Sequence, residues 1–292
     1  MADGVGLTDG RLPECAVARY WDDGFLFPIQ VMSAGEAAAA RAELEAVEHE
    51  WLDAGLPLPL NTYKRVNAQV VLPFVAEIAR APAILDVVEG ILGPDILVYA
   101  AEFFTKEPRT DAIVTMHQDL TYWGLGAIDG MVTAWLALSP ATPASGCMDF
   151  VRGSHKNPIL PHADSFDENN LLSRGQEVKV EIDAADKTPV ELAPGQISLH
   201  HGLTIHGSGP NRSDDRRIGC VIRYIRPDMQ QKVGAKDYVM AARGEDRFGN
   251  FVHTPAPHAT FSPESLAIYD DIRAEQSKTM MKGAEKKTGI YS

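Results

Sequence analysis

The order of segment types along the chain constrains the fold more than any single residue does. Up to Pro94 the sequence favours helices, whereas from Asp95 onward it consists of short segments rich in β-branched and aromatic residues, many of them separated by turns that contain Gly or Pro. Helices first and many short strands afterwards are typical of a jelly-roll barrel braced by a helical layer. We therefore predict a mainly β, cupin-like fold with its functional residues at the mouth of the barrel. The clearest strand segments are residues 96–99, 132–136, 196–199 and 220–224.

An N-terminal helical layer is predicted over residues 30–94. The run from Gly35 to Leu56 is rich in Ala and Glu, and it follows Ser33, a residue type that caps helices. A later helical pattern stops at Gly93, which is followed by a proline, as helix ends often are. The two shorter helical patterns of this layer span residues 73–80 and 82–91.

The β core is predicted over residues 95–226, and a C-terminal extension over 227–292. Within the core, the polar and broken segment between Ser154 and Val190 is interpreted as an insertion that borders the entrance of the site. Within the extension, helical patterns occur at residues 238–243 and 264–281. Because 292 residues are within the range of one large domain, we expect residues 1–292 to form a single domain.

Composition and charge argue against several classes of protein. The formal net charge of -13, from 40 acidic and 27 basic residues, repels phosphate backbones and disfavours a nucleic-acid partner. The sequence contains no run of about twenty apolar residues to span a bilayer, and its start lacks a secretion signal, so we expect a cytoplasmic enzyme without a membrane partner. The 3 cysteines are widely spaced and form no Cys-x-x-Cys pair, which indicates neither a disulfide framework nor a thiolate zinc site.

Three residues have the types and spacing of a metal site. His117 and Asp119 are two positions apart, and on a strand the side chains at i and i+2 project from the same face, so both could bind one ion. A third ligand, His206, would come from a distant strand. Two histidines and one carboxylate leave the other coordination positions open for a co-substrate and oxygen. The pattern predicts a non-haem Fe(II) site.

Further blocks surround these residues in a definite order along the chain. They are Phe103–Pro108, His117–Trp123, Val132–Leu138, Ser145–His155 and His206–Asn211. In this order the sequence resembles the phytanoyl-CoA dioxygenase family of Fe(II)/2-oxoglutarate oxygenases, the group that also includes the ectoine hydroxylases. The resemblance covers residues 60 to 226, and it implies a double-stranded β-helix with Fe(II), 2-oxoglutarate and O2 as cofactors.

The resemblance also implies how 2-oxoglutarate is held. A planar guanidinium binds a carboxylate through two parallel hydrogen bonds, which a lysine cannot reproduce. By the family's spacing this group is Arg217, with the Ser208 hydroxyl assisting. Arg212 and Arg216 are its competitors, and a solvated loop is the alternative interpretation of that cluster.

Other residues near these blocks are candidates for the surroundings of the metal site. Thr133 and Trp135 alternate with apolar residues on one predicted strand and could line the keto-acid pocket, with ordinary core packing as the alternative for Trp135. We interpret His200 and His201 as residues that line or flank the barrel, not as ligands. His155 lies at a turn and is interpreted as structural.

The metal carboxylate indicates the type of reaction. Halogenating relatives have a small residue at this position, so Asp119 favours hydroxylation over halogenation. We expect hydroxylation of an unactivated C–H bond of a small polar metabolite, with release of succinate and CO2. The alternatives are hydroxylation of an acyl-CoA thioester, and a non-oxidative metal-dependent enzyme or a binding module on the same barrel.

The sequence is least informative about the small-molecule substrate, and it leaves the oligomeric state open. Tyr122 and Trp123 directly follow the metal dyad and are candidates for the pocket wall. A second candidate segment contains Asn61, Tyr63, Lys64, Arg65 and Asn67. Its basic pair, Lys64 and Arg65, would suit a substrate with an anionic head group. An aromatic pair together with Asp149 would instead suit a substrate with an ammonium group. For each of these residues a place on the surface or in the core is the alternative.

Overall fold

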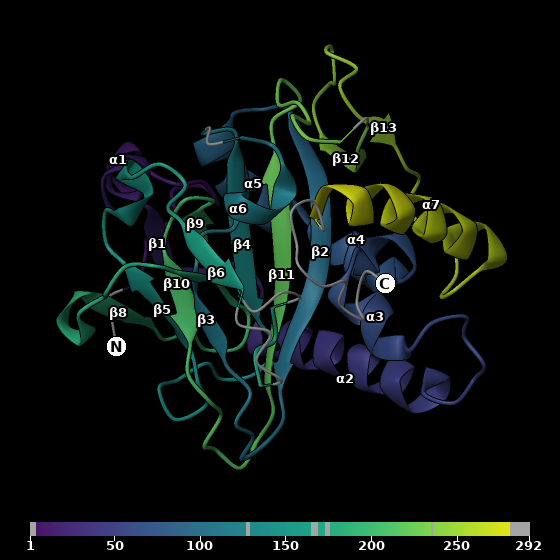
Figure 1. The fold of residues 1–292 in the computed structure, drawn as a ribbon, viewed down its shortest axis with the longest axis horizontal. Coiled ribbons are helices and arrows are strands. Elements are labelled where there is room, and N and C mark those ends of the chain that lie inside the picture. The colour runs from purple at the N-terminus through teal and green to yellow at the C-terminus, as the bar shows by residue number, and fades with distance from the viewer. Residues whose placement is uncertain (1–3, 127–128, 165–168, 173–175, 235, 281–292) are drawn as a thin grey trace.

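Two sheets form the core of the protein (Figure 1). The computed structural model describes residues 4–126, 129–164, 169–172, 176–234 and 236–280. The larger sheet has seven strands, and its neighbouring strands are antiparallel except for the last pair. In spatial order these strands are β1 (Phe25–Gln30), β9 (Gln196–His201), β4 (Met131–Ala137), β11 (Arg217–Ile225), β2 (Ile96–Lys106), β12 (Tyr238–Arg243) and β13 (Val252–His253).

The smaller sheet has four antiparallel strands and lies against one face of the larger sheet. In spatial order its strands are β3 (Val114–His117), β10 (His206–Ser208), β5 (Met148–Val151) and β8 (Lys187–Val190). Trp135 and Val221 of the larger sheet share one buried cluster with Met148 and Phe150 of the smaller sheet. This two-sheet packing confirms the predicted jelly-roll class. A separate two-stranded sheet is formed by β6 (His162–Asp164) and β7 (Gln176–Val178).

Helices cover the other face of the larger sheet. In Figure 1, α2, α3, α4 and α7 lie beyond β2, on the side away from β5 and β8. The helices are α1 (Glu14–Asp23), α2 (Ala34–Trp51), α3 (Leu60–Arg65), α4 (Pro73–Ala79), α5 (Pro82–Leu92), α6 (Leu120–Trp123) and α7 (Pro263–Met280). Short 3₁₀ turns are η1 (Ala68–Val70), η2 (Ser154–Lys156) and η3 (Ala184–Asp186). Within the described part of the chain, no helix combines the length and the apolar character that a membrane crossing requires.

The local sequence explains where the principal helices begin and end. Ser33 and Glu36 form a reciprocal capping box that satisfies two backbone N–H groups at the start of α2. Both α4 and α5 begin with a proline, whose fixed φ suits the first helical turn. The end of α5 is capped by Gly93, at a φ of 86° that disfavours residues with a side chain.

Two parts of the predicted organisation need correction. Residues 238–243 form strand β12, not a helix, because Met240 pairs with Val98 at the edge of the larger sheet. The β structure also begins earlier than residue 95, since β1 joins the opposite edge of the sheet beside β9. The predicted helix at 264–281 corresponds to α7, and Met281 lies outside the described residues, as do 165–168 and 173–175 of the predicted insertion.

Candidate functional site

The three predicted metal ligands lie together between the sheets. His117 ends β3 and His206 begins β10, and these two residues are Cα partners across the smaller sheet. Asp119 follows β3 and precedes α6. Its Oδ1 atom is 3.5 Å from His117 Nε2 and 3.9 Å from His206 Nε2. All three side chains are buried, and each offers one ligand atom within 4.8 Å of the others. The arrangement suits one metal ion.

Asp119 reaches this position by a different route from the predicted one. Its backbone has φ -56° and ψ -45°, so the residue belongs to the helical turn that opens α6 and not to an extended strand. The strand-alternation argument for the His117–Asp119 pair is therefore wrong, although the two side chains do converge. The chain turns into α6 directly after β3, and this turn directs the carboxylate toward His117.

Hydrogen bonds orient each of the three side chains. The Nδ1 atoms of His117 and His206 lie 2.8 and 2.9 Å from the carbonyl oxygens of Thr115 and Thr204, so an Nδ1–H donates there and leaves each Nε2 directed at the cluster. Burial lowers the pKa of His206 well below its ordinary value, and the nearby His117 lowers it further, which favours the neutral imidazole that metals bind.

The metal carboxylate is held at both oxygens. Thr133 Oγ1 donates a hydrogen bond of 2.9 Å to Asp119 Oδ2, and Arg223 Nη2 lies 3.5 Å from Oδ1. Burial alone would raise the pKa of Asp119, but the Arg223 guanidinium and the neighbouring imidazoles hold it well below its usual range. The predicted pocket residue Thr133 thus contacts the metal carboxylate.

Two buried basic residues, the cation pair, lie close to this cluster: Arg217 lines the same pocket, and Lys106 contacts Ser208, another lining residue. Arg217, the first residue of β11, is the Cα partner of Lys106, the last residue of β2. Arg217 is 1% exposed, and its Nε and Nη2 atoms have no hydrogen-bond partner among the described residues. Lys106 Nζ donates to Ser208 Oγ at 2.7 Å and to the Gly209 carbonyl. Within the described part of the chain, neither cation forms an ion pair with a carboxylate.

Two buried cations without a counter-ion are costly, and their environment lowers both pKa values. Burial, with Arg217 second, lowers the pKa of Lys106 to about 6. Burial likewise lowers the pKa of Arg217 to about 10. A carboxylate of a bound ligand would compensate these charges, so this end of the pocket fits the far carboxylate of 2-oxoglutarate. Lys106 was not singled out from the sequence, because its partner depends on the register of two distant strands.

Gly219 makes room for the tryptophan beside the cation pair. The Trp135 ring centroid lies 5.3 Å from Arg217 Cζ. A Cβ atom at residue 219 would be 2.0 Å from Trp135 Cζ2, so only glycine leaves space for the indole in this position. Trp135 thereby lines the pocket next to Arg217.

The metal cluster and Arg217 line one pocket, and Lys106 contacts it through Ser208, another lining residue. Its lining comes from both sheets, which agrees with a site inside the barrel. The lining residues are Phe104, Val114, His117, Asp119, Trp135, Met148, His200, His206, Gly207, Ser208, Arg217, Val221 and Arg223.

His200 and Arg223 are pocket residues that the sequence did not assign to the chemistry. His200 Nε2 is 3.5 Å from Asp119 Oδ2, and neither ring nitrogen has a hydrogen-bond partner among the described residues. Arg223 forms a buried ion pair with Glu102 and stacks over Trp123 at 4.6 Å. A signal for Arg223 was present, because it follows Arg217 by an even number of positions on one strand and so shares its face.

The other histidines and arginines singled out from the sequence do not line the pocket. His201 Nε2 is 3.2 Å from Asp129 Oδ1, and His155 Nε2 is 3.0 Å from the Trp21 carbonyl oxygen. Arg212 is exposed and pairs with Asp111. Arg216 is not the solvated loop residue of the alternative interpretation, because it is 18% exposed and bonded to three glutamates.

Most of the predicted substrate contacts are not part of this pocket. Tyr63 packs in the core against Phe261 and Tyr269, Lys64 pairs with Glu48, Asn67 donates to Gln276, and Asn61 is exposed. In the same segment, Arg65 stacks at 4.1 Å over Phe104, a lining residue.

The remaining substrate candidates are Asp149, Trp123 and Tyr122. Asp149 is the Cα partner of Gly207, so it occupies the face of the smaller sheet opposite to that of Met148 and His206. Trp123 is 7% exposed and packs against Tyr99. The side chain of Tyr122 lies outside the described part of the structure.

Comparisons with known proteins place this site in a family. The chain matches the family Phytanoyl-CoA dioxygenase (PhyH) over residues 20–219. It is 27% identical over 180 residues to a probable phytanoyl-CoA dioxygenase of Caenorhabditis elegans, an alignment that covers 60% of this chain and 58% of that protein. It is 26% identical over 224 residues to a probable alpha-ketoglutarate-dependent hypophosphite dioxygenase of Stutzerimonas stutzeri, with 73% of this chain and 75% of that protein covered.

A solved structure extends the likeness to nearly the whole fold. The non-heme monooxygenase ThoJ in its apo form superposes with a TM-score of 0.83 at 31% identity, covering 91% of this chain and 98% of that chain. The family match and the His-Asp-His cluster confirm the predicted cofactors, Fe(II), 2-oxoglutarate and O2. From its family match, its fold and its site, this chain belongs to the phytanoyl-CoA dioxygenase family of Fe(II)/2-oxoglutarate oxygenases.

Proposed function

We propose that this protein is an Fe(II)- and 2-oxoglutarate-dependent dioxygenase that hydroxylates an unactivated C–H bond of a small polar metabolite. One observation carries the proposal: a two-histidine, one-carboxylate cluster lines the same buried pocket as Arg217, which pairs with no carboxylate among the described residues, and Lys106 contacts Ser208 in the pocket wall. A metal-dependent hydrolase has no evident use for a second, cationic end. A keto-diacid such as 2-oxoglutarate, by contrast, would use both parts of the site: the metal for its keto-acid end and the basic residues for its far carboxylate.

Each part of the site has a distinct task in this proposal. His117, Asp119 and His206 would hold the ferrous ion and leave its other positions free. Arg217 and Lys106 would bind the far carboxylate, assisted by the Ser208 hydroxyl, which accepts a hydrogen bond from Lys106. When bound, the metal and 2-oxoglutarate supply the oxidising chemistry, with succinate and CO2 as co-products. Trp135 and Val221 help to exclude water from the pocket.

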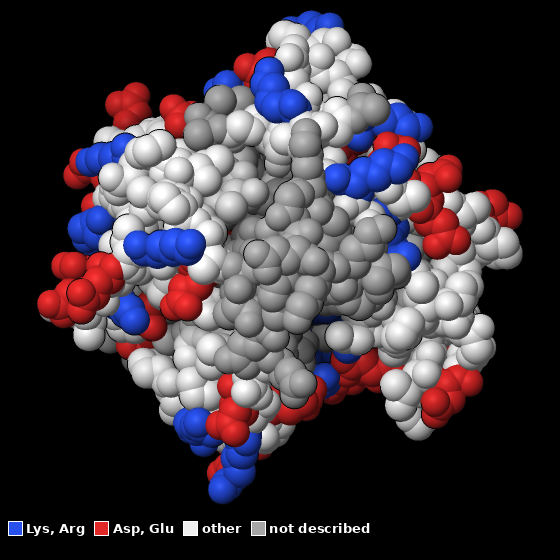
Figure 2. All heavy atoms as spheres, in the orientation of Figure 1, with Lys and Arg blue, Asp and Glu red and all other residues white. Residues whose placement is uncertain are grey.

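The charged lining supports a polar substrate. Beyond the metal and co-substrate residues, the lining includes Arg223, which is already paired with Glu102, and the imidazole of His200. Neither ring nitrogen of His200 has a hydrogen-bond partner among the described residues, and leaving them so beside a purely aliphatic chain would be costly. On the described part of the face in Figure 2, Lys and Arg are interspersed with Asp and Glu and do not gather into one basic patch for the phosphates of a thioester cofactor. The overall charge of -13 also disfavours a polyanion.

Hydroxylation of an acyl-CoA thioester is the second candidate, because it is favoured by the names of several relatives. A panel of acyl-CoA thioesters, free acids, amines and phosphonates would separate the two, with gain of one oxygen mass as the readout. Oxygenation confined to the thioesters would overturn the small-metabolite proposal.

The reaction class has its own test, which needs no substrate. The protein with Fe(II), 2-oxoglutarate and oxygen should release succinate slowly, and calorimetry should detect 2-oxoglutarate binding to the metal-loaded protein. If both were absent, or if zinc supported full activity where iron gave none, the non-oxidative alternative would replace the oxygenase.

A further inference from the structure

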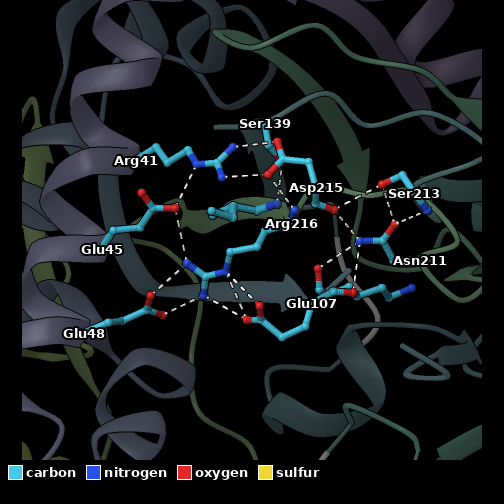
Figure 3. A network of polar contacts seen from close by, with 11 residues as sticks. Arg41, Glu45, Glu48, Glu107, Ser139, Asn211, Ser213, Asp215 and Arg216 are labelled. Carbon is cyan, nitrogen blue, oxygen red and sulfur yellow. Dashed lines mark hydrogen bonds and ion pairs between the residues drawn. The ribbon is translucent and has the colours of Figure 1, made fainter. Parts of the chain in front are cut away.

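An ion-pair network covers the outer side of the strand ends that carry Lys106 and Arg217 (Figure 3). It joins α2 and α3 to the residues that follow β2 and precede β11. We call it the α2 network and define it as Arg41, Glu45, Glu48, Lys64, Glu107, Asp215 and Arg216.

Arg216 is the centre of this network. Its Nη1 and Nη2 atoms donate to the two carboxylate oxygens of Glu48 at 2.8 and 3.0 Å, and its Nε donates to Glu107 at 3.0 and 3.1 Å. A further contact of 3.4 Å reaches Glu45 Oε1. In Figure 3 the guanidinium lies between the α2 glutamates and Glu107. Arg216 therefore bridges a helix and the end of β2.

The remaining members hold the same helix to the same loop. Arg41 donates to both carboxylate oxygens of Asp215 at 2.8 Å, and to Glu45 at 2.9 Å. Lys64 of α3 donates to Glu48 at 2.5 Å. Burial raises the pKa of Glu48, but hydrogen bonds from Arg216 and Lys64 outweigh this effect and bring its pKa below the ordinary value. Linked pairs of this kind hold geometry better than isolated surface pairs.

The network lies one residue away from the co-substrate anchor on both strands. Arg217, which lines the pocket, and Lys106, which contacts Ser208 in its wall, are Cα partners, and their chain neighbours Arg216 and Glu107 bond to each other on the opposite side. Side chains alternate across a sheet, so one backbone step separates the outer pair from the inner pair. A shift of Arg216 would therefore move the start of β11, and Arg217 with it.

Arg217 depends on this support because few hydrogen bonds of its own side chain fix it. Its Nε and Nη2 atoms are without hydrogen-bond partners among the described residues. The backbone around it, by contrast, is tightly held: buried Asn211 donates from Nδ2 to the carbonyls of Lys106, Glu107 and Asp215, at 3.1, 3.1 and 2.8 Å. The position of the Arg217 side chain is thus set mainly through the main chain.

We propose that Arg216 is a positioning residue for the co-substrate: by bridging α2 to the end of β2, it places Arg217 and Lys106 to receive the far carboxylate of 2-oxoglutarate. This inference rests on the proposed function and adds a role for α2, a helix outside the pocket. Preorganisation of this kind lowers the cost of binding without any contact to the ligand.

The test measures binding instead of turnover. In protein loaded with Mn²⁺ in place of iron, calorimetry should show that Arg216→Ala weakens 2-oxoglutarate binding about tenfold, because small displacements of a binding group are costly. Mn²⁺ affinity should change by less than about twofold, since no metal ligand contacts Arg216. Glu48→Gln should give a similar loss, and the double variant should lose little more than either single one. Arg216→Lys should recover only part of the affinity, because one ammonium cannot bridge both glutamates.

Two control variants separate positioning from general stability. Arg243 is a matched arginine, 24% exposed, that joins β12 to Asp86 and Glu89 of α5 at 2.7 and 2.6 Å, away from the pocket. Arg243→Ala should lower the melting temperature to a similar degree while leaving 2-oxoglutarate affinity unchanged. Arg212→Ala, which removes an exposed pair, should change neither.

The outcomes also distinguish this inference from the function on which it rests. If Arg217→Ala abolished 2-oxoglutarate binding while Arg216→Ala and Glu48→Gln matched Arg243→Ala, the positioning role would be wrong and the oxygenase would stand. If Arg217→Ala left 2-oxoglutarate binding intact, the anchor and the positioning role built on it would be wrong, whereas the proposed function would fail only if the unchanged protein bound no 2-oxoglutarate. Should Arg216→Ala not fold, Glu48→Gln and Glu107→Gln test the same bridge from its acidic side.

Discussion

Thr133 Oγ1 donates a hydrogen bond of 2.9 Å to Asp119 Oδ2, and through it β4 of the larger sheet holds the metal carboxylate. The other oxygen, Oδ1, is the one that lies near both histidine Nε2 atoms. The hydroxyl thus determines which carboxylate oxygen is directed at the metal. We expect Thr133→Val, which keeps the shape and removes the donor, to weaken metal binding by about 10- to 100-fold.

Metal titration of the apo protein, followed by calorimetry with Mn²⁺, checks this expectation. Thr254→Val is a suitable control, because Thr254 is also buried and donates to the Val239 carbonyl, far from the pocket in sequence and structure. Equal metal affinity in the Thr133→Val variant and the unchanged protein would show that the hydrogen bond has no orienting role.

Replacement of the co-substrate anchor should separate two affinities. Arg217→Ala is expected to weaken 2-oxoglutarate binding by about 30-fold or more, since truncating one partner of a buried charge pair leaves the other unpaired. Metal binding should remain almost intact, and Arg217→Lys should recover part of the loss. Binding isotherms for metal and for 2-oxoglutarate measure the two effects independently, with Arg212→Ala as the exposed control.

The lysine of the cation pair should make 2-oxoglutarate binding depend on pH. With its pKa lowered to about 6, chiefly by burial, Lys106 is protonated below pH 6 and neutral above it in the ligand-free protein. The ligand's carboxylate favours the protonated form, so binding above pH 6 takes up a proton. Affinity should therefore decrease as the pH rises from 6, by up to about tenfold per unit, until the pH passes the raised pKa of the complex.

Calorimetry of the Mn²⁺-loaded protein between pH 6 and 8.5 would measure both the decrease of 2-oxoglutarate affinity with pH and the proton uptake on binding. Lys106→Met should bind 2-oxoglutarate more weakly at pH 6 and show a much flatter profile. A profile of the same steepness in both proteins would assign the titration to another group.

The glycine beside Trp135 should be sensitive to a single methyl group. Gly219→Ala places a Cβ where Trp135 Cζ2 lies 2.0 Å away, and overpacking of a buried site typically costs about 1 to 3 kcal/mol. Urea unfolding should show this loss, and the displaced indole should also disturb Arg217 and weaken 2-oxoglutarate binding. Gly6→Ala, which meets nothing within 4 Å, should stay within about 0.5 kcal/mol of the unchanged protein.

The sequence predicts the fold class and the family well, because both depend on local patterns. The order of helices and short strands needs only neighbouring residues, and the blocks around His117 and His206 are continuous in the chain. Even there, local reasoning explains Asp119 wrongly, since it assumes a strand where the chain has already turned into α6.

What sequence reasoning misses depends on contacts between distant segments. Lys106 becomes part of the site only because β2 and β11 pair in the register that sets it beside Arg217. Residues 238–243 have a pattern that suits a short helix, and only the free edge of β2 makes them a strand. Likewise, nothing near Lys64 indicates that its ammonium is taken by Glu48 of α2.

The three candidate ligands come from β3, the start of α6 and β10, and the carboxylate among them is tied to β4. Such a cluster exists only when both sheets have assembled, so an unfolded chain offers no equivalent site. An ion that binds the folded form alone stabilises it by RT ln(1 + [M]/Kd), which is about 2.7 kcal/mol at a free concentration one hundred times Kd. The supply of ferrous ion would then set how much intact protein persists, as well as whether it can turn over.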